Sequence, residues 1–160
     1  MSTIERNEHK QQEKIMEVNK NIIINVPPEA VFEAITDPQQ LTQWFPDQAI
    51  LEPKVGGKMK FTSYKNSERG KDCGRERDKF HEGTITEFIP NKKISYTWEN
   101  LDEPDFPRTV VTWELEKIEN NKTNFKLAHT GFNADEMAKK YNEGWSYFLN
   151  ELVKLLEKTK

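Results

Sequence analysis

Apolar and polar positions alternate with a helical period near the C-terminus of the chain. Between residues 133 and 160 the apolar side chains recur every three or four positions, the spacing of one face of an α-helix. They are Met137, Tyr141, Trp145, Phe148, Leu149, Leu152, Leu155 and Leu156. The opposite face carries Lys139, Lys140, Glu143, Asn150, Glu151, Lys154 and Glu157. This pattern predicts one long amphipathic helix whose apolar face must be covered by another element.

The segments before this helix are shorter and predict mainly β-strands. β-Branched residues cluster at 22–26 and indicate a first strand within residues 15–26, which Pro27 and Pro28 end. Two short helices are expected next, at 29–35 and 38–44, the second with Asp37 as its N-cap. Six more strands are predicted at 49–52, 58–62, 80–89, 93–99, 109–118 and 123–130, with a charged, irregular connection at 66–79.

Alternation within these strands gives the sheet two different faces. One face is apolar and aromatic: Met59, Phe61, Ile85, Ile94, Tyr96, Trp98, Val111, Trp113, Leu115, Phe125 and Leu127, with Ser63, His81, Gly83 and His129 at the same parity. The other face carries Lys, Thr and Glu. Short turns favour antiparallel neighbours. The predicted fold class is α+β: a strand, two short helices, a curved antiparallel sheet, and a long helix that covers the apolar face.

Composition and charge narrow the classes of function. The chain has 160 residues, a length that suits one domain. Its net charge of −3 gives no long-range attraction for nucleic acid or an anionic membrane. The sequence shows neither a bilayer-length apolar run nor a signal pattern, so we expect a cytoplasmic protein without stable membrane association. The single cysteine, Cys73, suits a reducing compartment. Residues 1–14 predict a flexible polar leader before one folded domain at 15–160.

Several short motifs, taken in order, resemble those of a known superfamily. They lie at 28–38 with Leu41 and Trp44, and at 55–59, 83–87, 94–98, 111–115, 123–132 and 144–145. Together they resemble the START-like superfamily (SRPBCC, birch-pollen-allergen-like), and within it the family related to the C-terminal domain of the activator of the heat-shock protein 90 ATPase. The chain is expected to lack the partner domain of that cochaperone, so the family name does not define an activity.

The resemblance carries expectations about fold and function. It implies a helix-grip fold, in which the sheet wraps around the long C-terminal helix and a cavity opens between them. It also implies binding of lipids, sterols, polyketides or other hydrophobic molecules, and some relatives are cyclases or dehydratases. A START-like helix-grip domain is therefore expected over residues 15–160.

Aromatic residues are the first candidates for such a cavity. The chain is only 34% hydrophobic but has four Trp, four Tyr and nine Phe, which can build a core or line an apolar pocket. Parity places Trp98, Trp113 and Trp145 inward, where each is either a ligand-contacting wall or ordinary core packing. Gly144 lies in mid-helix, where glycine costs about 1 kcal/mol against alanine. We expect it to allow close packing on the sheet; a hinge at the cavity mouth is the alternative.

Polar candidates are few. His81 and His129 point inward by parity; each could anchor a ligand carboxyl or hydroxyl or act as a general base, although the residues alone favour a buried histidine bonded to its neighbours. No metal is predicted, because His9, His81, His129 and Cys73 lack ligand spacing. Residues 69–79 mix bases and acids without aromatics, as a solvated loop does, and could act as a flap. No catalytic constellation is visible, although a bulge could turn Glu87 or Glu114 inward.

Three functions remain, in this order. The first is non-catalytic binding of a small hydrophobic or amphipathic molecule between the sheet and the C-terminal helix, without a cofactor. Its candidate ligand-binding residues are Trp44, Phe61, His81, Trp98, Trp113, His129, Trp145, Phe148 and Leu149. The second is a cyclase- or dehydratase-type enzyme that uses His81 or His129. The third is a chaperone-related regulatory protein, which would need an exposed patch on the outer sheet face, and that face is polar by parity.

Overall fold

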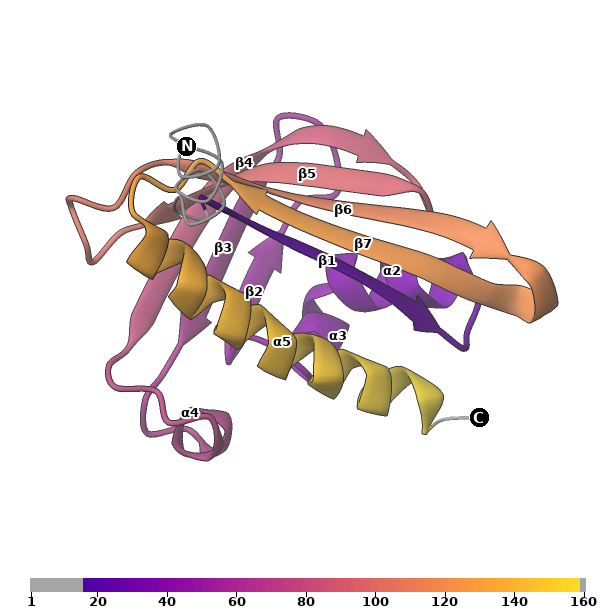
Figure 1. The fold of residues 1–160 in the computed structure, drawn as a ribbon, viewed down its shortest axis with the longest axis horizontal. Coiled ribbons are helices and arrows are strands. Elements are labelled where there is room, and N and C mark those ends of the chain that lie inside the picture. The colour runs from indigo at the N-terminus through magenta and orange to yellow at the C-terminus, as the bar shows by residue number, and fades with distance from the viewer. Residues whose placement is uncertain (1–15, 159–160) are drawn as a thin grey trace, which may run out of the picture.

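The chain forms a seven-stranded antiparallel sheet that curves around a long C-terminal helix (Figure 1). The computed structural model describes residues 16–158. The strand order is β1-β7-β6-β5-β4-β3-β2. In chain order the elements are β1 (Glu17–Ile24), α2 (Pro28–Thr36), α3 (Pro38–Leu41), β2 (Gln48–Leu51), β3 (Lys58–Ser63), α4 (Glu68–Asp72), β4 (Lys79–Ile89), β5 (Lys93–Asn100), β6 (Thr109–Ile118), η1 (Glu119–Asn121), β7 (Lys122–Thr130) and α5 (Asp135–Glu157).

The α+β fold class predicted from the sequence is confirmed, and one connection differs. The long helix expected at 133–160 is α5, and each predicted strand has its counterpart. The segment 66–79, predicted as irregular, contains the short helix α4, so that prediction is wrong for residues 68–72. Ser67 caps α4, since its hydroxyl accepts a hydrogen bond from Gly70 N at 3.0 Å. The predicted leader at 1–14, including His9, lies outside the described residues.

Helix α5 lies along the concave side of the sheet, next to the edge strand β1 (Figure 1). Its apolar stripe is buried at Trp145, Leu149, Leu152 and Leu156. Two bonds join it to the β1 side: Lys20 Nζ donates to Ser146 Oγ at 2.8 Å, and Asn25 N donates to Glu157 Oε2 at 2.9 Å. In the described part of the chain, no helix is long and apolar enough to cross a membrane.

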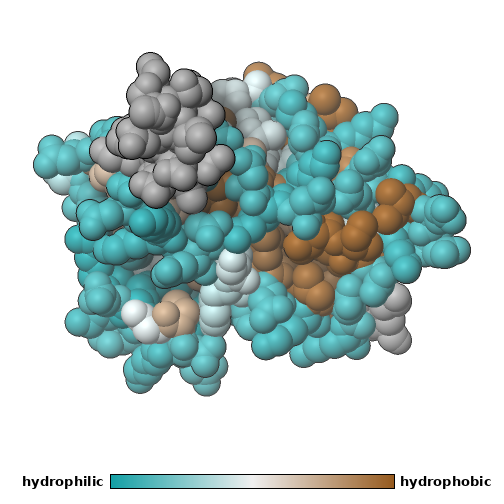
Figure 2. Space-filling model, viewed as in Figure 1, coloured by the Kyte–Doolittle hydropathy of each residue, from teal (hydrophilic) through white to brown (hydrophobic). Residues whose placement is uncertain are grey.

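The surface around α5 is mostly hydrophilic, with one hydrophobic area. Figure 2 shows brown atoms gathered where β1 ends beside the C-terminal half of α5, and teal atoms over most of the remaining face. On this face α5 therefore meets apolar surface at its C-terminal half, whereas hydrophilic surface atoms surround its N-terminal half.

A bulge in β4 changes the parity of that strand. The register with β5 shifts between Ile85 and Glu87, so Phe88 turns inward and packs against Phe32 with ring centroids 5.5 Å apart. Glu87 and Glu114 both form ion pairs with Lys93, at 3.2 and 3.5 Å, on the outer face. The bulge therefore directs an aromatic ring, and neither of these carboxylates, into the core.

Candidate functional site

A cleft of about 930 Å³ opens between the N-terminal half of α5 and the end of the sheet formed by β4 and β5. The segment that precedes β4 and the loop between β5 and β6 form its remaining walls. Four basic residues (Arg75, Arg77, Lys79, Lys140) and four acidic residues (Glu76, Glu103, Glu136, Glu143) border it, so its rim has no net formal charge. This volume is in the range of small-molecule sites.

Aromatic rings line the deeper part of the cleft. Phe148 contacts Phe45 with ring centroids 4.7 Å apart, and Phe45 in turn stacks on Trp98 at 6.2 Å. Trp145 lies 5.8 Å from Trp98 and also borders the cleft. These rings come from α5, from β5 and from the turn after α3, so the cleft is built where three elements meet. Such a surface can bury the apolar body of a ligand.

Five of the nine candidate residues lie in the packed core and do not line the cleft: Trp44, Phe61, Trp113, His129 and Leu149. Trp44 Nε1 donates to Ala34 O at 2.8 Å, and Trp113 Nε1 donates to the Tyr96 hydroxyl at 2.8 Å. Trp113 also stacks on Phe125 at 5.3 Å. The other four, His81, Trp98, Trp145 and Phe148, do line the cleft.

His129 is fully enclosed and has a partner at each ring nitrogen. Trp145 Nε1 donates to His129 Nδ1 at 3.1 Å, which requires that nitrogen to be unprotonated. The single proton of the neutral ring is then on Nε2, which lies 2.7 Å from Thr109 Oγ1. The Thr109 hydroxyl accepts from His129 and donates its own hydrogen bond to Trp98 O at 3.1 Å. Burial lowers the pKa of His129 to about 3, so the ring is neutral at pH 7.

His81 is also buried, but it lines the cleft and only one of its nitrogens has a partner. Its Nε2 lies 3.2 Å from the Tyr141 hydroxyl, which accepts a hydrogen bond from Trp98 Nε1 at 3.2 Å. Its ring lies over that of Trp98, with centroids 4.3 Å apart. Burial, followed by the charges of Lys79 and Arg75, lowers the pKa of His81 to about 3. Its Nδ1 is buried without a partner.

Gly83 allows β4, the strand that carries His81, to lie close to β5. A Cβ at this position would fall 1.7 Å from Thr97 O, so only glycine allows β4 and β5 to approach in this way. His81 lies two residues before Gly83 in β4 and pairs with Asn100 of β5. Asn100 also lines the cleft, and its Oδ1 is the second buried polar atom without a partner.

The segment from α4 to β4 closes one side of the cleft and is held at several points. Arg69 donates to the carbonyls of Thr42 and Gln43 at 3.1 and 2.7 Å. Tyr147 of α5 donates its hydroxyl to Asp72 Oδ2 at 2.6 Å. Burial and this bond raise the pKa of the Tyr147 hydroxyl, which therefore keeps the proton that it donates. The segment is thus attached both to the turn after α3 and to α5.

Gly144 is not packed against the sheet, contrary to the sequence-based expectation. A Cβ at this position would meet no atom within 4 Å, and Gly144 borders the cleft. Its neighbour Trp145 makes the close contacts instead, with Trp113 at 5.3 Å. The glycine therefore leaves space in the cleft and is not needed for close approach of the helix.

The structure adds cleft residues that the sequence analysis did not select. Tyr141 precedes Trp145 by one helical turn, and Asn100 follows Trp98 at the same strand parity, so both could have been found from spacing alone. Phe45, Phe106 and Cys73 lie in turns, where no periodicity predicts which way a side chain points.

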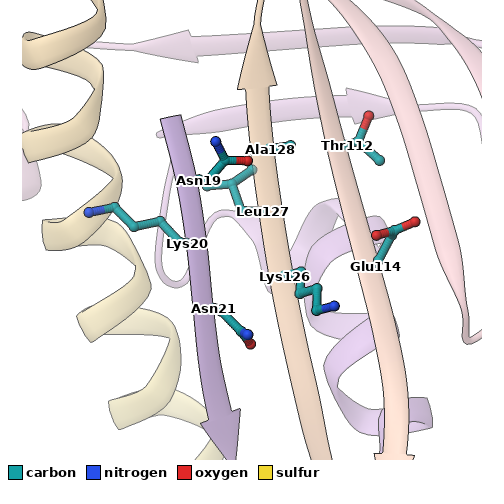
Figure 3. A pocket seen from close by; sticks show the side chains of 8 residues that line it. All are labelled: Asn19, Lys20, Asn21, Thr112, Glu114, Lys126, Leu127 and Ala128. Atoms are coloured by element: carbon teal, nitrogen blue, oxygen red, sulfur yellow. The ribbon is translucent and has the colours of Figure 1, made fainter. Parts of the chain in front are cut away.

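A second, shallower hollow of about 220 Å³ lies on the outer face of β1, β7 and β6 (Figure 3). Asn19, Asn21, Thr112, Glu114 and Lys126 surround the small side chain of Ala128. In Figure 3 the Lys20 side chain points away from it, toward α5. This hollow is smaller than the cleft and has no aromatic wall, so the cleft is the better candidate site.

Beside its charged residues, the cleft offers neutral hydrogen-bonding groups on aromatic walls. Burial raises the pKa of Tyr141 and lowers that of His81, so neither group changes its charge near pH 7. Within residues 16–158 no group of three or more His, Cys, Asp or Glu side chains is placed to hold a metal ion. The arrangement suits binding better than proton transfer.

Comparisons with known proteins agree with this architecture. A family model described as "Activator of Hsp90 ATPase homolog 1-like protein" matches residues 25–157. Protein MLL2253 from Mesorhizobium loti has 24% identity to the chain and a TM-score of 0.74, with 90% of this chain and 98% of that chain covered.

Two further solved structures have names that mention HSP90 or Aha1. An HSP90 activator from Plasmodium falciparum is 26% identical with a TM-score of 0.69, covering 89% of this chain and 97% of that one. The Aha1 dimer from Colwellia psychrerythraea is 25% identical with a TM-score of 0.67, covering 89% and 97%. No curated protein matches the chain.

Proposed function

Because the chain belongs to the family of Activator of Hsp90 ATPase homolog 1-like proteins, whose helix-grip fold it shares, we propose that it binds a small amphipathic molecule in the cleft beside α5, without catalysing a reaction. The observation that carries this proposal is the aromatic cleft of about 930 Å³. A ligand that covers Trp98, Trp145 and Phe148 gains roughly 25 cal/mol for each Å² of apolar surface buried, before the entropic cost of binding.

The cleft combines charged residues with aromatic rings and a few buried polar groups, which suits a ligand with one apolar body and a polar group. Trp98 and Trp145 are each at most 2% exposed, so they present only part of their rings to the cleft, whereas Phe148 is half-buried. The candidates that remain buried in the core, such as Trp113 and Trp44, would then act by holding these walls in place. The proposed contact residues are therefore His81, Trp98, Trp145 and Phe148.

Substitution of Gly144 tests the proposal without disturbing the core. Gly144→Trp should block the cleft and abolish binding of a neutral apolar probe such as N-phenyl-1-naphthylamine, measured by probe fluorescence. Gly144→Ala is the matched control: it should retain binding and raise the free energy of unfolding by about 1 kcal/mol, because alanine is the better helix former. Equal probe binding by the wild-type protein and Gly144→Trp would contradict the proposed site.

Acid–base catalysis by a cleft histidine is less favoured by the electrostatics. His129 has no contact with the cleft, and a pKa of about 3 makes His81 a weak base. A cyclase or dehydratase would need another group to move the proton, and the described cleft contains no paired nucleophile and base.

Regulation of an HSP90 chaperone is the second candidate, favoured by the family match and by the 26% identity to an HSP90 activator. The decisive measurement is the ATPase rate of the HSP90 from the same organism with and without this protein. A higher ATPase rate in the presence of this protein would mean that its main function is to bind the chaperone, and that ligand binding in the cleft is secondary. A cytoplasmic location stays a prediction, based on the single cysteine.

A further inference from the structure

Two residues that line the cleft from neighbouring strands each carry a buried polar atom without a partner. In residues 16–158, the buried side-chain polar atoms without a hydrogen-bond partner are His81 Nδ1 and Asn100 Oδ1. The two residues are paired across β4 and β5, and both line the cleft. Folded proteins rarely leave such atoms unpaired, because burial removes the water that would otherwise bond to them. Their coincidence in one cleft indicates that a molecule entering the cleft, either water or a ligand, supplies the missing partner.

The bonding pattern identifies His81 Nδ1 as a donor. Trp98 Nε1 can only donate, so the Tyr141 oxygen accepts from it. The Tyr141 proton is then free to be donated to His81 Nε2, 3.2 Å away, which makes that nitrogen an acceptor. Because the ring is neutral, its one proton is on Nδ1. In this tautomer the Trp98 and Tyr141 protons are both donated within the group, and only the His81 Nδ1 proton is left for an outside acceptor.

The bonding pattern likewise identifies Asn100 Oδ1 as an acceptor. The amide nitrogen of Asn100 donates to Glu103 Oε1, and a carboxylate cannot donate in return, so the orientation of the amide is fixed. Glu103 is itself held by an ion pair with Arg77. The amide oxygen therefore remains for an outside donor.

A donor beside an acceptor selects the chemistry of the ligand head group. A carboxylate or phosphate could accept from His81, but its oxygens would repel Asn100 Oδ1. An ammonium group could donate to Asn100 Oδ1, but its N–H groups would repel the proton on His81 Nδ1. A hydroxyl group accepts one hydrogen bond and donates another, so it satisfies both atoms. The rim, with equal numbers of acids and bases, adds no preference for a charged ligand.

We propose that the ligand of the cleft is a neutral alcohol or phenol whose hydroxyl accepts from His81 Nδ1 and donates to Asn100 Oδ1, with its apolar body against Trp98 and Phe148. This inference rests on the proposed binding function and specifies the class of ligand. It predicts selection against carboxylates of the same shape.

Three probes of matched shape test the head group: 2-naphthol, 2-naphthoate and naphthalene. Calorimetric titration at pH 7 should show about tenfold tighter binding of neutral 2-naphthol than of naphthalene, and weaker binding of 2-naphthoate than of 2-naphthol, because only the hydroxyl pairs both buried atoms. Asn100→Leu should remove the preference for 2-naphthol over naphthalene. Asn150→Leu makes the same change on the exposed face of α5 and should leave the preference intact.

A measurement on the unaltered protein avoids dependence on the folding of Asn100→Leu. In protein labelled with ¹⁵N-histidine, the His81 Nδ1 resonance should be that of a protonated nitrogen. Its proton should shift downfield with 2-naphthol and not with naphthalene. Equal affinity for all three probes, with no such shift, would overturn the head-group inference and leave cleft binding standing. Failure of all three probes to bind would overturn both.

Discussion

The two buried histidines show how the space beneath α5 is divided between a closed region and an open one. Both rings contact Trp98, and burial lowers both pKa values to about 3. His129 nevertheless has a partner at each nitrogen, whereas His81 has one nitrogen left over. Two histidines that are both buried can therefore differ in how many of their hydrogen bonds are made. The missing hydrogen bond at His81, more than its pKa, distinguishes the candidate binding region from the structural one.

The largest expected effect is a difference in the free energy of unfolding between variants at the two histidines. His129→Leu should lower the free energy of unfolding by about 2–4 kcal/mol, because the buried Trp145 N–H loses its acceptor and Thr109 loses a partner. His81→Leu should change it by no more than about 1 kcal/mol, because it also removes an unpaired nitrogen. Urea unfolding of both variants measures the difference. Similar losses in the two variants would end the distinction between closed and open regions.

The pH dependence of stability should be shared equally by the two histidines. Their folded pKa of about 3 lies below the ordinary value of 6.5, so the unfolded chain takes up protons first as the pH falls. Each histidine should therefore cost about 1.4 kcal/mol of stability between pH 7.5 and 5.5, with the loss continuing until about pH 3.

Unfolding curves at the two pH values check this sharing. Each His→Leu variant should lose about 1.4 kcal/mol less than the wild-type protein over the interval. A smaller share for His81 than for His129 would contradict the equal sharing and would mean that the closed and open regions differ in pH response as well as in bonding.

Much of this arrangement follows from sequence, and the division into two regions does not. Strand parity correctly placed Trp98, Trp113 and both histidines on the inner face. Parity gives the side of the sheet but not the depth of packing. Trp113 is enclosed because Trp44 and Phe125 pack against it, a contact between residues far apart in the chain. Only the folded structure shows that Trp98, with the same parity, borders a cleft.

Two other features escaped prediction for local reasons. Helix α4 has only five residues, four of them charged, so no apolar period marks it; it is held by Arg69 and Ser67 instead. Gly144 was expected to face the sheet, since glycine in a helix commonly permits close packing. Its open surroundings depend on where the wall formed by residues 73–79 lies, and that position is set by Arg75 and Asp47, which pair at 3.3 Å.

The smallest expected effect concerns the segment that closes the open region. Tyr147→Phe removes the bond to Asp72, a partly exposed contact worth about 1 kcal/mol or less. Global stability should hardly change, but amide hydrogen exchange in residues 68–74 should become faster. Phe148→Leu, the neighbouring control, should leave that exchange unchanged. Unaltered exchange in Tyr147→Phe would mean that Arg69 and Arg75 hold the segment without help from α5.

The balanced rim of the cleft has a kinetic consequence. Four cationic and four anionic side chains surround the mouth, so a charged solute approaching it experiences little net field. Association with a neutral ligand should then proceed at a rate that is nearly independent of ionic strength, because there is no steering for salt to screen. How long molecules stay would be set by contact with the aromatic walls.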